Sequence, residues 1–165
     1  MSRIHSFPFS ADERSRVLIL GSMPGVESLK QQQYYAHPRN LFWEFMGELF
    51  GAGRELPYEE RLAGLRDNRI ALWDVAHSCV RPGSLDSNMS AVEANDFEAL
   101  LRVSPNIESV FFNGQKAARL FNTLVLPGLK RDLDFITLPS TSPANASVSK
   151  AQKKSAWKRL LDQTV

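Results

Sequence analysis

Aromatic and polar side chains crowd together between residues 33 and 43, which read Gln-Tyr-Tyr-Ala-His-Pro-Arg-Asn-Leu-Phe-Trp. Aromatic faces beside a carboxamide and a guanidinium are the groups that hold a planar, hydrogen-bonding ligand such as a nucleobase. An ordinary solvated loop is built more simply from small polar residues. The crowding of Tyr34, Tyr35, His37 and Arg39 therefore predicts a ligand-binding segment.

The same segment also has a purely structural interpretation. Pro38 suits the first turn of a helix over residues 39–50, where Asn40 would satisfy free backbone amides. The apolar stripe of that helix would consist of Leu41, Phe42, Phe45, Met46 and Leu49, with Gly51 at its end. Spacing alone favours this interpretation, but it leaves the aromatic and charged residues before the helix unexplained.

The elements that would position this segment follow from the hydrophobic pattern. Short apolar runs typical of buried strands lie at residues 16–20, 70–73, 110–112 and 135–138. Helical spacing occurs at residues 39–50, 57–66, 95–103 and 115–125, and Asn95 is the candidate cap of the third stretch. Strands that alternate with helices predict an α/β fold, with three α/β/α layers around a central four-stranded, mainly parallel sheet.

Small or polar residues follow each predicted strand, in the segments 21–25, 74–79, 113–115 and 139–145. Ligands of open α/β sheets bind at the carboxyl ends of the strands, so we expect the site where these segments meet. Residues 21–25, Gly-Ser-Met-Pro-Gly, would let backbone amides approach an anion or a base, although an ordinary turn is the simpler explanation. They match neither a phosphate-binding loop with Gly-Lys-Ser/Thr nor the three-glycine dinucleotide fingerprint.

The other segments each allow two interpretations. The carboxamide of Asn113 can read the edge of a base or cap a turn, and Asp74 is either a cap or a polar group at the sheet edge. Serines of residues 139–145 can bind phosphate oxygens, but their composition also suits any surface turn. The last helix, with Trp157, Leu160 and Leu161 facing inward, has a basic face that is either solvated or directed at phosphates. Its basic residues are Lys150, Lys153, Lys154, Lys158 and Arg159.

Composition limits the remaining possibilities. The chain has 165 residues, 43% of them hydrophobic, so we expect one domain over residues 1–165. The single cysteine, Cys79, excludes an intrachain disulfide and an iron–sulfur cluster and leaves no ligand set for a structural zinc. A net charge of +2 means that any contact with DNA would depend on a local patch. Without a membrane-length apolar run or a signal-peptide pattern, we expect a soluble, cytoplasmic protein. We also expect it to be a monomer.

Taken together, the motifs resemble a known family. The segments 21–25, 34–43, 112–114 and 140–145 are similar to those of the hypoxanthine-DNA (deoxyinosine) glycosylase branch of the uracil-DNA glycosylase superfamily. The resemblance runs in order from about residue 16 to Trp157, and the Tyr-Tyr-x-His-Pro-x-Asn-x-Phe-Trp segment is its most specific part. It implies a four-stranded parallel sheet, a pocket for a flipped base, no metal or cofactor, and DNA with deaminated bases as the partner.

The resemblance also implies roles for individual residues. Asn40 would be the catalytic residue, Tyr35 would line the pocket, Phe42 would stack on the base and Asn113 would read its edge. The pocket would be lined through the backbone by Gly21, Ser22, Met23, Pro24 and Gly25. The residues expected to contact DNA are Ser140, Thr141, Ser142, Pro143, Asn145 and Lys150.

Two features of the sequence bear on the substrate. Residues 21–25 contain no Asp or Glu where uracil-specific enzymes place a water-activating acid, and residues 139–145 contain no His. Both features fit the deoxyinosine branch. We therefore expect hydrolysis of the N-glycosidic bond of hypoxanthine, in which Asn40 orients water and stabilisation of the leaving base supplies most of the acceleration. The alternatives are a uracil- or xanthine-DNA glycosylase, a domain that binds nucleotides or damaged DNA without cutting, and a hydrolase of free nucleosides.

Overall fold

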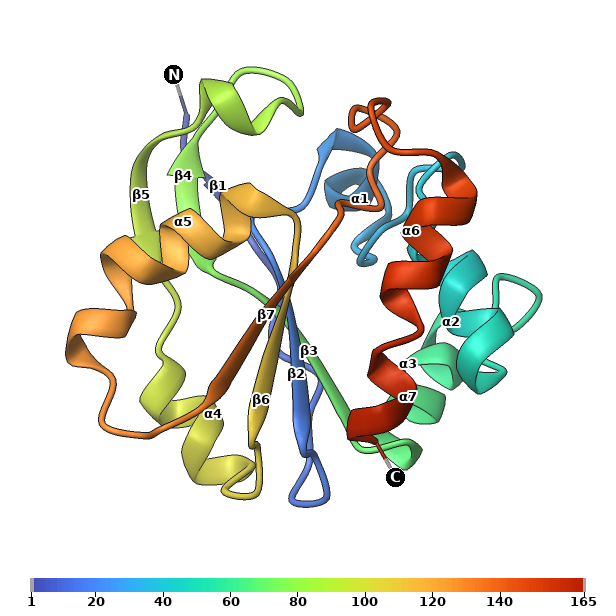
Figure 1. The fold of residues 1–165 in the computed structure, drawn as a ribbon. Helices are drawn as coiled ribbons and strands as arrows, with labels where there is room; N and C mark the ends of the chain where they lie inside the picture. Colours follow the sequence, from blue (N-terminus) through green and yellow to red (C-terminus); the bar gives the residue numbers. More distant parts are fainter. Residues whose placement is uncertain (1, 165) are drawn as a thin grey trace.

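A parallel sheet forms the centre of the computed structural model, which describes residues 2–164. Its four strands lie in the order β3-β2-β6-β7 (Figure 1). They are β2 (Val17–Gly21), β3 (Ile70–Asp74), β6 (Ser109–Asn113) and β7 (Asp134–Leu138). The predicted α/β fold is confirmed, and every predicted strand lies within one residue of its expected bounds.

Strand register brings the carboxyl ends to one edge of the sheet. Gly21 at the end of β2 pairs with Asp74 at the end of β3, and Asn113 pairs with Leu138 across β6 and β7. Every residue of β2, β3 and β6 is buried, as their continuous apolar runs predicted. The residues that follow these strands therefore meet at a single edge.

Helices cover both faces of the sheet (Figure 1). One layer contains α2 (Phe42–Phe50), α3 (Tyr58–Asp67), α6 (Lys150–Trp157) and α7 (Leu160–Gln163), and the other contains α4 (Phe97–Val103) and α5 (Gln115–Leu124). Aromatic side chains join each layer to its neighbours. Phe42 packs edge-on against Trp157 in the first layer, and Phe97 packs against Trp73 of β3 in the second.

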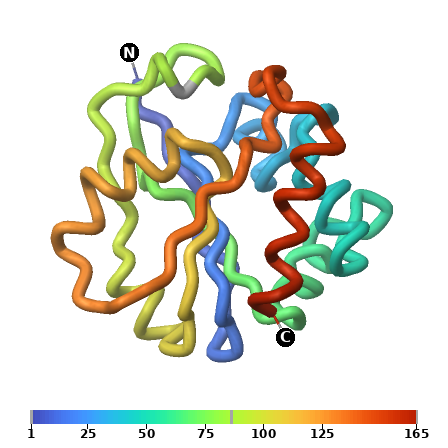
Figure 2. The backbone as a smooth tube through the Cα atoms, in the orientation of Figure 1, coloured from blue at the N-terminus to red at the C-terminus, as the bar shows by residue number. Residues whose placement is uncertain are grey.

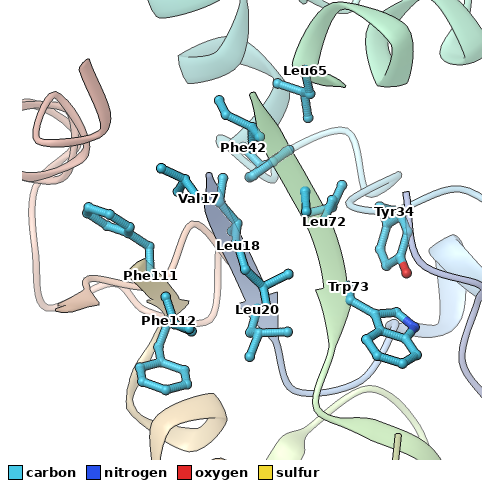
Figure 3. Packing of buried hydrophobic residues seen from close by; sticks show 14 of the residues in the cluster. Val17, Leu18, Leu20, Tyr34, Phe42, Leu65, Leu72, Trp73, Phe111 and Phe112 are labelled. Atoms are coloured by element: carbon cyan, nitrogen blue, oxygen red, sulfur yellow. The ribbon is translucent and has the colours of Figure 1, made fainter. Parts of the chain in front are cut away.

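The main core lies between the sheet and its helices. Figure 3 shows Leu18 and Leu20 of β2 beside Leu72 of β3, with Phe42 and Leu65 approaching from the helices. Burial of these large apolar side chains is the principal source of stability and fixes the strands that end at the site. No described helix has the length and apolar character needed to cross a membrane.

A second, antiparallel sheet was not expected from the sequence. Its order is β1-β4-β5, formed by β1 (Ile4–His5), β4 (Ala76–Val80) and β5 (Ser90–Ala94). Only Val75 separates β3 from β4, so the prediction of a strand-end loop over residues 74–79 is wrong beyond Val75. Ala76 and Cys79 are fully buried in a small cluster with Met23, which explains why this stretch pairs as a strand. The remaining elements are α1 (Val26–Gln31) and two short 3-10 turns, η1 (Asp86–Asn88) and η2 (Leu126–Gly128).

Three details of the helices differ from expectation. The helix predicted from residue 39 begins at Phe42, because residues before it form turns. The cap of α4 is Asp96, whose carboxylate accepts a hydrogen bond from the Ala99 amide, whereas Asn95 donates to the Asp74 carbonyl oxygen. Leu161 is exposed rather than inward-facing.

Candidate functional site

A cavity of about 590 Å³ opens at the carboxyl edge of the parallel sheet. Its volume is that of a typical small-molecule pocket. Segments that are far apart in the sequence meet there, as predicted from the small and polar residues at the carboxyl ends of the strands. The lining includes residues 21–28, Tyr34, Tyr35, His37, Asn40, Asp74, Ser84, Leu85, Asn113 and residues 140–145.

Gly21 allows two oxygens to approach the end of β2. A Cβ on Gly21 would lie 2.5 Å from Asp74 Oδ1 and 2.8 Å from the Tyr35 hydroxyl oxygen, so any side chain here would clash with both. Asp74 is only 3% exposed, yet it borders the cavity. The glycine predicted to give close access to the backbone therefore also makes room for a buried carboxylate and a phenol.

Tyr35 forms an aromatic wall of the cavity. Its ring stacks on Phe42, with centroids 4.2 Å apart and planes inclined by 27°. Its backbone adopts a φ of 55°, in the left-handed region that a tyrosine rarely occupies. Phe42 itself is fully buried behind Tyr35 and does not line the cavity. In this structure Tyr35 covers one face of Phe42, and the predicted stacking of Phe42 on a base stays a prediction.

The segment between Tyr34 and Asn40 is held by side chains from several elements. The Trp43 indole donates to the Tyr34 carbonyl oxygen at 2.7 Å, and the Tyr58 hydroxyl accepts from the Tyr34 amide at 3.0 Å. Arg54 Nη2 donates to the carbonyl oxygens of His37 at 2.8 Å and Asn40 at 3.1 Å. These bonds satisfy backbone groups that no helix or strand pairs, so they fix the conformation of an irregular segment.

Asn40 lies half-buried on the cavity wall, immediately before α2. Its Oδ1 accepts a hydrogen bond from the Phe42 amide at 3.0 Å, and its own amide donates to the His37 carbonyl oxygen. The first bond is the helix-start contact that the structural interpretation expected. A carboxamide oxygen has two lone pairs, so this bond orients Oδ1 and leaves capacity for a second donor.

Asn113 is tied to the loop that follows β7. Its Nδ2 donates to Thr141 Oγ1 and its Oδ1 accepts from the Thr141 amide, both at 2.9 Å. Thr141 is fully buried although it borders the cavity, and its predicted contact with DNA stays a prediction. Both ends of the Asn113 carboxamide hold the loop in place, while its reading of a base edge stays a prediction.

The loop over residues 139–145 is stiffened by its own side chains. Ser140 Oγ accepts from the Ser142 amide, Ser142 Oγ accepts from the Ala144 amide, and Asn145 Nδ2 donates to the Ser140 carbonyl oxygen. Ser140, Ser142, Pro143 and Asn145 all line the cavity. The loop is therefore held in one conformation by its own hydrogen bonds and forms a wall of the cavity.

Lysines of α6 serve different partners than expected. Lys150 Nζ pairs with Glu44 of α2 at 2.7 Å, and Lys154 pairs with Glu48 at 2.8 Å, so both link the two helices. The Glu44 carboxylate raises the pKa of Lys150. Lys153 is buried and its Nζ approaches the Ser142 carbonyl oxygen, and burial lowers its pKa. Lys153 therefore contacts a residue of the cavity lining, and the predicted DNA contact of Lys150 stays a prediction.

Several site residues were missed from the sequence. Arg81, which is buried, donates to the Pro24 carbonyl oxygen at 2.6 Å and to the Gly83 carbonyl oxygen at 2.8 Å. Ser84 Oγ accepts from the Val26 amide at 2.8 Å. These bonds tie residues 81–84 to the first cavity segment. The Pro-Gly pair after Arg81 marked a turn, but no sequence pattern placed that turn beside residues 21–25.

Metal ligands do not gather at this site. Among the side chains that the structure describes, no group of three or more His, Cys, Asp or Glu is arranged to hold an ion. The cavity instead offers an aromatic face, three carboxamides, two carboxylates, hydroxyls and backbone amides, which together suit a planar polar ligand.

Comparison with known proteins gives consistent matches. The model of the Uracil DNA glycosylase superfamily matches residues 7–162. A hypoxanthine DNA glycosylase of Methanosarcina acetivorans is 40% identical over 154 residues, which cover 92% of this chain and 93% of that protein. One of Methanosarcina barkeri is 38% identical over 152 residues, with the same coverage. The solution NMR structure of a candidate uracil DNA glycosylase from Methanosarcina acetivorans superposes with a TM-score of 0.82 at 37% identity, over 99% of both chains.

Proposed function

This chain belongs to the uracil DNA glycosylase superfamily, and from that premise we propose that it is a hypoxanthine DNA glycosylase of base-excision repair. It hydrolyses the bond between hypoxanthine and deoxyribose in DNA. The observation that carries the proposal is the position of Asn40, oriented on the wall of a cavity that also presents the face of Tyr35. The two similar proteins named as hypoxanthine DNA glycosylases support the choice of base.

We propose that the extruded base lies on Tyr35. Phe42 supports one face of the tyrosine ring, which leaves the ring backed by the core as a rigid platform. Stacking on an aromatic face is worth about 1–3 kcal/mol per base. Base flipping is needed because the glycosidic bond of a stacked nucleotide is out of reach, and a mispaired inosine is extruded more easily than a normal base.

Polar groups of the cavity then recognise the base. Deaminated bases share a ring N–H next to a carbonyl oxygen. The buried carboxylate of Asp74 is an acceptor for that N–H, and backbone amides of residues 21–25 are donors for ring and carbonyl acceptors. Adenine presents a ring nitrogen without hydrogen at the same position, so a carboxylate disfavours the undamaged base.

The reaction needs water and a stabilised leaving group. The C1′–N9 bond breaks with its electron pair going to the base, the water oxygen bonds to C1′, and the water proton is transferred to the departing base. Asn40 cannot remove a proton from water at neutral pH, so its Oδ1 orients the water beneath C1′. Hydrogen bonds to the developing base anion supply most of the acceleration.

The proposal extends to the oligomeric state of the protein and to its contacts with DNA outside the cavity. We expect residues 1–165 to act as a single domain and a monomer in the cytoplasm, with no cofactor. The loop over residues 139–145 presses on the damaged strand through Ser140, Ser142, Pro143 and Asn145, which line the cavity mouth. Lys150 approaches a phosphate when it is not engaged with Glu44.

Base release from labelled duplexes that differ only in carrying inosine, uracil or xanthine tests the function. We expect inosine to be cleaved fastest and Asn40→Ala to lower single-turnover excision by at least about 100-fold. The matched control is Asn122→Ala, which removes an exposed carboxamide from α5. Circular dichroism checks that both variants keep the fold.

Each alternative has its own result in the same assay. Faster release of uracil or xanthine would support the proposed site but show that another base is the preferred substrate. Binding of all duplexes without release would identify a DNA-binding domain. Release from free deoxyinosine but not from DNA would identify a nucleoside hydrolase. Full activity of the Asn40→Ala variant would mean that Asn40 has only a structural role at the start of the helix.

A further inference from the structure

We propose that a groove on a different side of the molecule from the cavity binds a linear segment of a partner protein, one that carries large apolar side chains next to acidic ones. This α4 groove lies between residues 94–102 and residues 124–131 and has a volume of about 440 Å³, which is within the range of ligand pockets. Figures 1 and 2 show its walls, in yellow-green and orange, away from the red-orange loop over residues 140–145. The inference goes beyond the proposed function and does not depend on it.

The floor of the α4 groove is apolar and fixed by the core. Phe97 is buried and packs edge-on against Phe121, with ring centroids 5.4 Å apart. Isolated apolar side chains are common on protein surfaces, but these share one concave surface. The other apolar lining residues, which are only partly covered, are Leu101, Leu124, Val125 and Leu129.

Gly128 keeps the second wall of the groove open. A Cβ on Gly128 would meet no atom within 4 Å, and the backbone there does not have a positive φ. Neither the backbone conformation nor the packing of this chain therefore requires a glycine at the position. A large side chain on residue 128 would narrow the groove without straining the protein.

Basic side chains in the groove favour an acidic occupant. Arg102, Lys130 and Arg131 all line it, and none of the ion pairs formed by the described residues includes them. Arg131 Nη2 donates to the carbonyl oxygens of Pro105 and Ile107, which fixes the guanidinium but leaves its positive charge in place. Carboxylates of a partner segment would complement these charges.

The two ends of α4 differ in charge along the groove. Asp96 caps the helix and Glu98 lies in its first turn, whereas Arg102 lies in its last turn. We therefore expect a bound segment to have one direction, with its acidic residues beside the C-terminal end of α4. An apolar centre with a charged rim is the composition of a protein–protein interface, and a short amphipathic segment binds such a groove through spaced apolar anchors.

Selection from a phage-displayed library of random peptides tests the groove. Peptides of about 12 residues are long enough for a helix to present apolar anchors at i, i+3, i+4 and i+7. The library is first depleted on the Gly128→Phe variant, in which the groove is narrowed, and is then selected on the unaltered protein. We expect the enriched peptides to combine large apolar residues with Asp or Glu.

Fluorescence anisotropy of the most enriched peptide then measures its affinity for matched variants. We expect Gly128→Phe and Arg102→Glu each to weaken binding by about tenfold or more. Asn122→Phe and Arg119→Glu introduce the same side chains at exposed positions of α5 outside the groove lining, and they should keep the affinity within about twofold. Replacement of the acidic residues of the peptide by Gln should weaken its binding to the unaltered protein much more than to Arg102→Glu.

Several results would overturn the proposal. One is the enrichment of no peptide, and another is equal binding of the enriched peptide by Gly128→Phe, Arg102→Glu and the unaltered protein. A dimer in sedimentation velocity that Gly128→Phe abolishes would make a second copy of the chain the occupant. Binding of decanoate without any enriched peptide would assign the groove to a small amphipathic anion. Because the peptide assay contains no DNA, failure to excise inosine would contradict only the proposed function.

Discussion

Tyr35 shows how a local backbone conformation serves the site. Its left-handed φ carries an energetic cost that the surrounding hydrogen bonds of the 34–40 segment offset. In return, the ring turns toward the cavity and rests on Phe42, which is packed against Trp157. The aromatic wall of the cavity is therefore continuous with the hydrophobic core.

Substitutions of Tyr35 separate the ring from the hydroxyl. Tyr35→Leu removes the aromatic face, and we expect kcat/KM for inosine in DNA to fall by about 10–100-fold. Tyr35→Phe keeps the face at the same backbone position and should lose less than about fivefold. Single-turnover and steady-state excision assays measure both. Equal losses in the two variants would mean that the hydroxyl beside Asp74, and not the ring face, is the important group.

The sequence could predict which residue types belong to the site but not the direction of each side chain. Tyr35 and Phe42 are both aromatic members of one motif, and only the turn between them decides that Tyr35 faces the cavity and Phe42 the core. Thr141 was assigned to DNA among neighbours of similar polarity, yet it points inward to Asn113. Such choices depend on backbone dihedrals in irregular segments, where no hydrophobic period exists to guide a prediction.

At the scale of elements, one side-chain pair joins the sheet to the cavity wall. Asn113 ends β6, and its carboxamide bonds to Thr141 through two hydrogen bonds that cross from the central sheet to the loop after β7. Leu41, just before α2, extends the connection because its amide donates to the Thr141 carbonyl oxygen. Thr141 thus connects the strand, the loop and the segment that carries Asn40.

Breaking this pair should weaken the protein and its activity together. Asn113→Ala leaves the buried Thr141 amide without its acceptor, and we expect the free energy of unfolding to fall by about 1–3 kcal/mol. Thr141→Val should cost less because it retains the amide, and the double variant should cost less than the sum of the two. Urea unfolding measures these values.

The ratio of the excision rates for two bases shows whether Asn113 only positions the loop or also contacts the base. If Asn113 only positions the loop, Asn113→Ala slows inosine and uracil excision by the same factor. A changed ratio between the two bases would show that its carboxamide also contacts the base, as the family resemblance implied.

Regular elements were predictable because their hydrophobic pattern is strong. β2, β3 and β6 contain continuous apolar runs and are buried, whereas β7, Asp-Phe-Ile-Thr-Leu, is mostly exposed. The helices α3 and α5 begin and end within one residue of the predicted bounds. The antiparallel sheet escaped prediction because β4 and β5 mix polar with apolar residues, and β4 follows β3 after a single residue. Without a continuous apolar run or a turn signal between β3 and β4, the pattern does not distinguish a second strand from a loop.

At the scale of the whole molecule, the buried tyrosines should make the protein less stable at alkaline pH. Burial raises the pKa of Tyr34 well above its usual 10.0, and burial likewise raises the pKa of Tyr58. The protonated phenol of Tyr34 donates to the Pro8 carbonyl oxygen. Because the unfolded chain releases these protons at lower pH than the folded chain, their contribution to stability is complete below pH 10 and declines as pH rises further.

Unfolding by urea from about pH 8 to about pH 11 tests this dependence. We expect the midpoint of the unaltered protein to fall across the upper half of the range. Tyr34→Phe should be less stable at pH 8, because it loses the hydrogen bond to Pro8, and should show a flatter decline. Parallel curves for the two proteins would assign the alkaline loss to other groups.

The hairpin formed by β4 and β5 has a consequence for how enzymes of this shape diversify. Its tip carries Leu85, whereas its strands are fixed in the antiparallel sheet. Tips of hairpins accept changes of length and composition without moving the strands that carry them. Residues 85–89 of the tip can therefore be exchanged while Arg81 and Ser84, which hold Pro24 and Val26 of the cavity lining, are kept. A library of such tips tests whether this edge of the cavity sets the choice between mismatches, bulges and single strands.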